Sequence, residues 1–104
     1  MAETEEEYIL DKNDFLEQQE VIKKQILSNT KLQGSQKRMA ITVLESIGHS
    51  VAAGGVRQHG ITRQMLKVSL PIFGKMSDDK RHNEKELKVL NALTILVYEA
   101  LHKR

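Results

Sequence analysis

The chain has 104 residues, the size of one domain, which excludes a two-domain protein. Hydrophobic residues make up 39% and charged residues 29% of it, a balance typical of a folded, soluble protein. There is no cysteine, which excludes disulfides, thiolate metal sites and cysteine nucleophiles and favours a reducing compartment. Because the charge-free stretch 89–98 is far shorter than the ~20 residues that span a bilayer, we expect a cytoplasmic protein with no membrane partner.

The net charge of +2 conceals two oppositely charged parts. Residues 1–20 contain eight acidic residues and one lysine, a net charge of −7, whereas residues 21–104 contain fifteen basic and six acidic residues, a net charge of +9. A block of like charge is typical of a solvated segment, and a basic remainder is typical of a protein that binds phosphates or acidic proteins. We therefore predict an acidic flexible tail over residues 1–12 and a single helical domain over 13–104. If the tail has a function, we expect it to fold over the basic surface of the domain and to weaken the non-specific binding of partners to that surface.

Apolar residues recur at helical spacing in the first half of the chain. They predict a first helix over residues 14–28, with an acidic N-cap at its start. The turn-forming residues 29–35 then predict a loop, in which Ser35 is the expected N-cap of the next helix. This second helix reaches about Ala53, because Gly54-Gly55 is costly inside a helix and predicts a break.

Two shorter signals divide the second half. Thr62 suits an N-cap, and Pro71 disfavours helical geometry in the residue before it, so we predict a third helix over 62–70. The last helix begins at Asn83, as a capping box indicates, or earlier at Ser77, and continues to about residue 102. No alternating strand pattern or hairpin signal occurs. The predicted fold class is therefore all-α, a small four-helix domain.

The last predicted helix is apolar on more than one face. One explanation is a homodimer in which this helix is shared with a second copy, and the other is a central helix in a monomeric bundle. We expect the homodimer. Its predicted interface consists of Leu87, Leu90, Leu93, Leu96, Val97 and Leu101.

Residues that carry catalytic or metal chemistry are scarce. The four histidines show no close ligand spacing, and no cysteine is present to assist them, so we expect no metal and no cofactor. Paired carboxylates in an apolar neighbourhood are also missing, since the acidic residues are concentrated at the N-terminal end. We therefore expect that the protein is not an enzyme.

The most informative segment for function is a run of residues in which a glycine, a buried aliphatic residue and a capping threonine precede an amphipathic helix. Its outward positions carry Arg, Gln and Lys, which suit guanine, adenine and phosphate respectively. Over about residues 56–70 the chain resembles the turn and recognition helix of GntR-type helix-turn-helix regulators, here without a β wing. The residues that carry this resemblance are Gly60-Ile61-Thr62-Arg63-Gln64-Met65-Leu66-Lys67-Val68-Ser69-Leu70.

The resemblance implies contacts with duplex DNA at Thr62, Arg63, Gln64 and Lys67. Our leading hypothesis is a small transcriptional regulator that binds duplex DNA through a basic helical surface. The alternative is a protein–protein interaction module, such as an anti-activator, a chaperone or an adaptor, with no nucleic-acid role. In the leading hypothesis the phosphate contacts come from Lys31, Lys37, Arg38 and Arg57.

Overall fold

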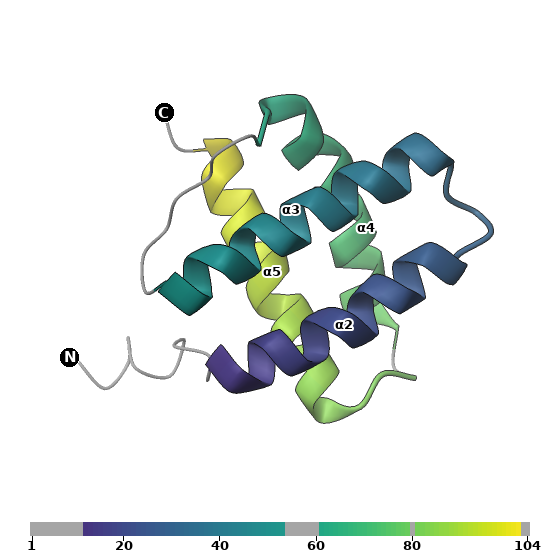
Figure 1. Cartoon of the computed structure of the whole chain (residues 1–104). Helices are drawn as coiled ribbons and strands as arrows, with labels where there is room; N and C mark the ends of the chain where they lie inside the picture. The colour runs from purple at the N-terminus through teal and green to yellow at the C-terminus, as the bar shows by residue number, and fades with distance from the viewer. Residues whose placement is uncertain (1–11, 54–60, 80, 103–104) are drawn as a thin grey trace.

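The computed structural model describes residues 12–53, 61–79 and 81–102 (Figure 1). Over these ranges the chain forms four α-helices and no strand, namely α2 (Lys12–Ser28), α3 (Gly34–Ala53), α4 (Arg63–Asp78) and α5 (Glu84–His102). The predicted all-α, four-helix class is confirmed. None of these helices combines the length and the apolar character that crossing a membrane would need.

The first two helices follow the predicted pattern with shifted starts. α2 begins at Lys12, two residues earlier than predicted, and ends at Ser28 as predicted. α3 begins at Gly34, so Ser35 lies in its first turn and is not the N-cap. The backbone N–H of Lys37 donates to the carbonyl of Gln33 (3.0 Å). Gln33 therefore accepts the first helical hydrogen bond of α3.

α2 and α3 approach each other closely at Gly48, a buried residue of α3. A Cβ atom added at this position would clash with the side-chain amide of Gln19 on α2. Glycine costs a helix about 1 kcal/mol relative to alanine, and here its missing side chain leaves the space in which Gln19 lies. An ion pair between Lys23 and Glu45 (3.0 Å) joins the same two helices, and the bond to this carboxylate raises the pKa of Lys23.

α4 continues to Asp78, so the predicted end of the third helix at Leu70 is wrong. A proline in a helix interior lacks an N–H and crowds the carbonyl four residues back, at a cost of roughly 3 kcal/mol. Pro71 lies on the exposed side of α4. The next two residues, Ile72 and Phe73, are only 8% and 0% exposed, and burying two such side chains contributes about 3 to 6 kcal/mol. Packing therefore offsets the local cost of the proline, and the helix continues.

α5 begins at the first of the two predicted starts. The backbone N–H of Glu86 donates to Oδ1 of Asn83 (2.9 Å), and Nδ2 of Asn83 donates to Oε1 of Glu86 (2.9 Å). The alternative start at Ser77 is wrong, because Ser77 lies in the last turn of α4. Between the two helices, the guanidinium of Arg81 contacts both carboxylate oxygens of Asp79 (2.8 Å to Oδ2), which holds the pKa of Asp79 well below its usual range.

The four helices form two antiparallel pairs that cross each other (Figure 1). α2 pairs with α3, and α4 pairs with α5; α3 also packs against α4, and α5 packs against α2, so the helices close around one core. Each helix turns an apolar stripe toward this core. The buried hydrophobic residues are Phe15, Ile22, Ile26, Ala40, Val43, Leu44, Ile47, Leu66, Ile72, Phe73, Val89, Leu90, Leu93, Val97 and Leu101.

A polar cluster fastens the start of α5 to α2 and to the connection before it. Oε2 of Glu86 contacts Nδ1 of His82 (2.7 Å) and accepts a hydrogen bond from Nε2 of Gln25 on α2 (3.3 Å). The side chains of His82 and Glu86 are only 10% and 12% exposed. Because the capping bond from Asn83 occupies the other carboxylate oxygen, this single carboxylate holds three side chains from two parts of the chain.

Candidate nucleic-acid interface

The start of α4 is built as the sequence predicts. The hydroxyl of Thr62 accepts a hydrogen bond from the backbone N–H of Met65 (3.1 Å), so Thr62 is confirmed as the N-cap. Leu66 is buried and Ile61 packs partly against the core. This helix end is therefore fixed by one cap and by apolar contacts on its inner side.

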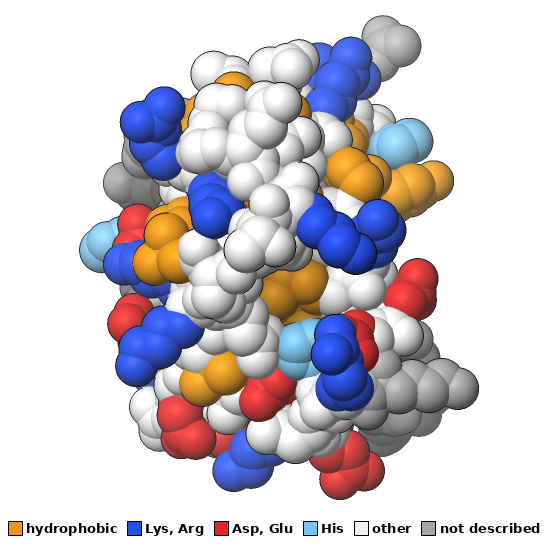
Figure 2. All heavy atoms as spheres, turned by 90° about the vertical axis from the view of Figure 1, so that its right-hand side faces the viewer, with side chains coloured by type: hydrophobic (Ala, Val, Ile, Leu, Met, Phe, Trp, Pro, Cys, Tyr) orange, Lys and Arg blue, Asp and Glu red, His pale blue; other side chains and the backbone are white. Residues whose placement is uncertain are grey.

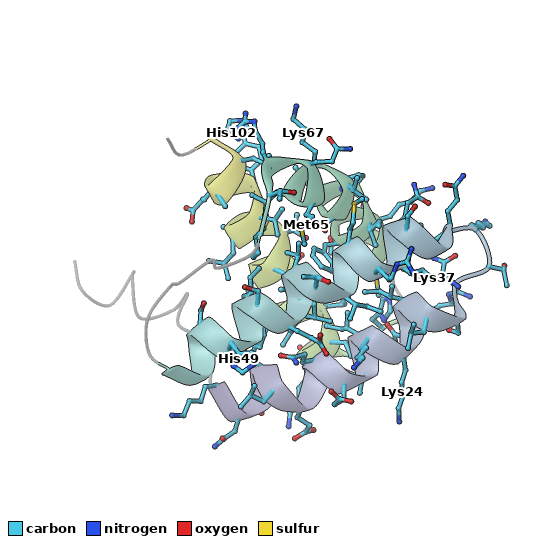
Figure 3. All side chains as sticks on the ribbon, turned by 45° about the horizontal axis from the view of Figure 1, so that its top comes forward. Lys24, Lys37, His49, Met65, Lys67 and His102 are labelled. Atoms are coloured by element: carbon cyan, nitrogen blue, oxygen red, sulfur yellow. The ribbon has the colours of Figure 1, made fainter. Side chains whose placement is uncertain are left out.

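The three outward residues of this helix start are exposed, as expected: Arg63, Gln64 and Lys67. Arg63 also has a contact that the sequence did not indicate, because its Nη1 donates to the carbonyl of Leu101 near the end of α5 (2.9 Å). A guanidinium has five N–H donors, so Arg63 retains further N–H donors for a ligand. The side chain of Lys67 makes no hydrogen bond or ion pair to any residue described, and it projects outward from the molecule (Figure 3).

The predicted phosphate contacts lie at the corner where α2 meets α3, which we call the cationic corner (Lys31, Lys37 and Arg38). Lys31 and Arg38 are exposed, and their side chains form no bond with the described residues. Nζ of Lys37 donates to the carbonyl of Leu27 near the end of α2 (2.8 Å). The fourth predicted phosphate contact, Arg57, lies outside the described residues.

The structure brings the predicted DNA-contact residues together as two groups. One group is the start of α4, and the other is the cationic corner. Figure 3 shows that Lys67 and Lys37 project from different parts of the surface, and that Lys24 points away from both. Residues 21–44 and 61–77, from which both groups come, contain eight Lys or Arg and no acidic residue. Figure 2 views the molecule from the α2–α3 corner; most of the acidic side chains in this view lie in its lower half, whereas basic side chains are spread over both halves. Two cationic regions are thus available on an acid-free part of the chain.

The predicted helix-turn-helix segment spans the connection between α3 and the start of α4. α4 begins at Arg63, where the sequence predicts the recognition helix to begin, and α3 ends at Ala53. Most of the predicted turn between them lies outside the described residues. Residues 72–78, where the strands of a wing would begin, are helical. The described residues thus show a capped helix that begins after Thr62 and no β wing directly after Leu70.

The residues predicted to form a dimer interface lie mainly in the core of the single chain. Leu90, Leu93, Val97 and Leu101 are buried against the other helices, and Leu87 and Leu96 are half-buried. This differs from the prediction, because α5 uses its main apolar stripe to pack against α4 and α2. The large apolar residues that α5 leaves exposed are Ile95 (48%) and Tyr98 (52%), and the ring of Tyr98 stacks on that of His102 with 4.1 Å between the centroids.

Sequence reasoning missed that two of the predicted DNA-contact residues also bind helix ends. Arg63 binds the end of α5 and Lys37 binds the end of α2, where carbonyl groups lack helical partners and the helix dipole favours a cation. For Lys37 a signal was available, since the last turn of α2 contains no basic residue of its own. The contact between Arg63 and Leu101 spans 38 positions and has no local signal. Among the residues described, no group of three His, Asp or Glu side chains is placed to hold a metal ion.

Resemblance to other proteins gives no further guide to this interface. No protein-family model matches the chain, and no significant similarity to a curated protein or to a solved structure was found. The resemblance of residues 56–70 to GntR-type regulators therefore depends on those residues alone.

Proposed function

We propose that the protein is a DNA-binding regulator that presents the first two turns of α4 to the major groove of duplex DNA. The observation that carries this proposal is the capped start of α4, where Arg63, Gln64 and Lys67 are all exposed on a segment without acidic residues. Arginine suits guanine O6 and N7, and glutamine suits adenine. The free N–H groups of a helix start favour a phosphate oxygen.

The cationic corner supplies the second part of the interface in this proposal. Its side chains carry no base specificity, but they neutralise phosphates and release counterions. The chain's two acid-free stretches make this electrostatic attraction local, although the net charge of the whole chain is only +2. Binding through both regions is therefore expected to weaken steeply as the salt concentration rises.

Lys67→Ala is the sharpest test, because this side chain has no bond within the described part of the protein and its loss should not disturb the fold. We expect the slope of log K against log[salt] to fall by about one, since one phosphate contact contributes about 0.9. The measurement is fluorescence anisotropy of a labelled duplex over a series of salt concentrations.

Lys24→Ala is the matched control for this experiment. Lys24 is exposed on α2 and points away from both cationic regions (Figure 3). It should leave the slope close to that of the wild type. Equal slopes for the two variants, or the absence of any salt-dependent binding by the wild type, would contradict the proposal.

A second candidate function is a protein–protein interaction module without a nucleic-acid role, and we propose a second copy of the chain as its partner. The observation that favours it is a seam of exposed residues on α5 with the alternating three- and four-residue steps of paired helices. When two such helices lie antiparallel, the Lys88 end of one copy meets the Glu99 end of the other, so the charges are complementary. The seam consists of Lys88, Asn91, Ile95, Tyr98 and His102.

Ile95→Glu is expected to abolish self-association, because it places a charge at the centre of the seam. Sedimentation velocity over a range of protein concentrations measures the effect, with Leu27→Glu as the control at an equally exposed leucine on α2. A charge swap adds a second criterion: Lys88→Glu should weaken the dimer, and Lys88→Glu combined with Glu99→Lys should restore it. A wild-type chain that stays monomeric at every concentration would exclude this candidate.

A further inference from the structure

The residues that precede α2 carry a dense negative charge. Residues 1–11 contain four glutamates and one aspartate and no basic residue, a formal charge of −5. α2 starts at the next residue, Lys12, so this acidic segment is covalently attached at one end of α2. The opposite end of the same helix carries the cationic corner.

The surface around the attachment point does not suit an acidic segment. The first half of α2 carries Asp14, Glu17 and Glu20, and the last two are exposed. Nζ of Lys85 on α5 lies 3.9 Å from Oδ1 of Asp14, so the positive charge of Lys85 is partly compensated. Like charges therefore repel the acidic segment from the first half of α2, and complementary charge is found farther along the helix.

The cationic corner provides that complementary charge. Between residues 21 and 44 there are five Lys or Arg and no acidic residue. Lys23 is paired with Glu45, whereas Lys31 and Arg38 are exposed and their side chains are unpaired among the described residues. A lysine ammonium has three N–H donors. Lys37 uses one of them for the carbonyl of Leu27, so the others remain for a carboxylate.

The acidic segment is long enough to reach this corner. Helices rise 1.5 Å per residue, so the 17 residues of α2 span roughly 25 Å. An extended segment of eleven residues spans up to about 36 to 40 Å. The segment can therefore follow α2 along its whole length and bring the glutamates farthest from α2, such as Glu3 at about 30 Å of extended chain, to Lys31 and Arg38.

We propose that residues 1–11 bind the cationic corner of the same molecule and compete there with the phosphates of duplex DNA. The contact itself depends only on the charges and distances given above, whereas the competition rests on the proposed function. The segment would act as a built-in counterion: nonspecific DNA, held mainly by phosphate contacts, is displaced more readily than a site that also engages the start of α4.

A spin label tests the contact without DNA. The chain has no cysteine, so Thr4→Cys gives a single attachment point for a nitroxide. We expect the label to broaden the backbone amide signals of residues 31–38, and we expect them to recover in 1 M salt, where the Debye length is about 3 Å. The matched control carries the same label with Glu3, Glu5, Glu6 and Glu7 changed to Gln.

Two results would overturn the contact. One is the absence of broadening at residues 31–38, and the other is equal broadening in the control with four glutamines. A mixture of labelled, isotope-free protein and unlabelled, isotope-enriched protein serves as a further arm. Broadening in that mixture would show a contact between molecules and would contradict the proposal.

Anisotropy with a random-sequence duplex tests the competition. If the segment occupies the corner about nine-tenths of the time, the variant with four glutamines binds roughly tenfold more tightly than the wild type at low salt. The control for overall charge changes four exposed glutamates outside the segment to Gln, namely Glu17, Glu20, Glu84 and Glu99. Unchanged affinity in the four-glutamine variant would overturn the competition. If no chain binds duplex at low salt, the proposed function fails, and the spin label still decides the contact.

Discussion

Phe73→Ala is expected to lower the free energy of unfolding by about 3 to 5 kcal/mol, the range for removing a large aromatic side chain from a packed core. Phe73 is fully buried on α4, two residues after Pro71. Its side chain stands in the core because the helix continues through the proline. Urea denaturation followed by circular dichroism measures the effect.

An exposed leucine provides the control for this substitution. Leu27 is 52% exposed, so Leu27→Ala should change the free energy of unfolding by less than about 1 kcal/mol. If α4 ended at residue 70, Phe73 would lie in a connection and its removal would cost little. A loss for Phe73→Ala as small as that for Leu27→Ala would therefore contradict both the burial of Phe73 and the course of α4.

Glu86→Ala should have the second-largest effect, a loss of about 2 to 3 kcal/mol, because it leaves the nearly buried side chain of His82 and the partly buried side chain of Gln25 without this partner. The carboxylate of Glu86 contacts His82, Asn83 and Gln25. A buried donor that loses its acceptor costs about 1 to 3 kcal/mol, more than the net gain of an ordinary hydrogen bond. Urea denaturation again gives the free energy.

Glu84→Ala is the matched control, since Glu84 lies in the same first turn of α5 and is exposed. It should cost well under 1 kcal/mol, the value typical of a surface charge near a helix start. A double-mutant cycle with His82→Ala would isolate the contact between His82 and Glu86. Similar losses for Glu84→Ala and Glu86→Ala, or a coupling near zero in the cycle, would show that the contacts of Glu86 do not stabilise the start of α5.

Several local features could be predicted because their causes lie within four residues of one another. The N-caps Thr62 and Asn83 bond to groups three positions later, so the residue types and their spacing are enough to identify them. The exposure of Arg63, Gln64 and Lys67 also follows from helical periodicity, once the apolar face of α4 is assigned to the core. The candidate interface at the start of α4 was therefore visible in the sequence.

Other features depended on contacts between distant parts of the chain. Pro71 predicts a helix end from local sterics alone, and it was overridden because Ile72 and Phe73 pack against other helices. The sequence does not indicate that Arg63 reaches the carbonyl of Leu101, since that requires the start of α4 to lie beside the end of α5.

The sequence by itself determined that four helices form in the described part of the chain, that α4 begins after Thr62, and that many of the basic residues fall on acid-free stretches. Only the tertiary structure decided which apolar face of α5 is covered. Periodicity shows that Leu90, Leu93 and Val97 share one stripe, but it does not identify what that stripe packs against. Here α4 and α2 cover it, and Ile95 and Tyr98 are left exposed. The reason is physical: helical spacing and capping are short-range, whereas burial is set by whichever surfaces the whole chain brings together.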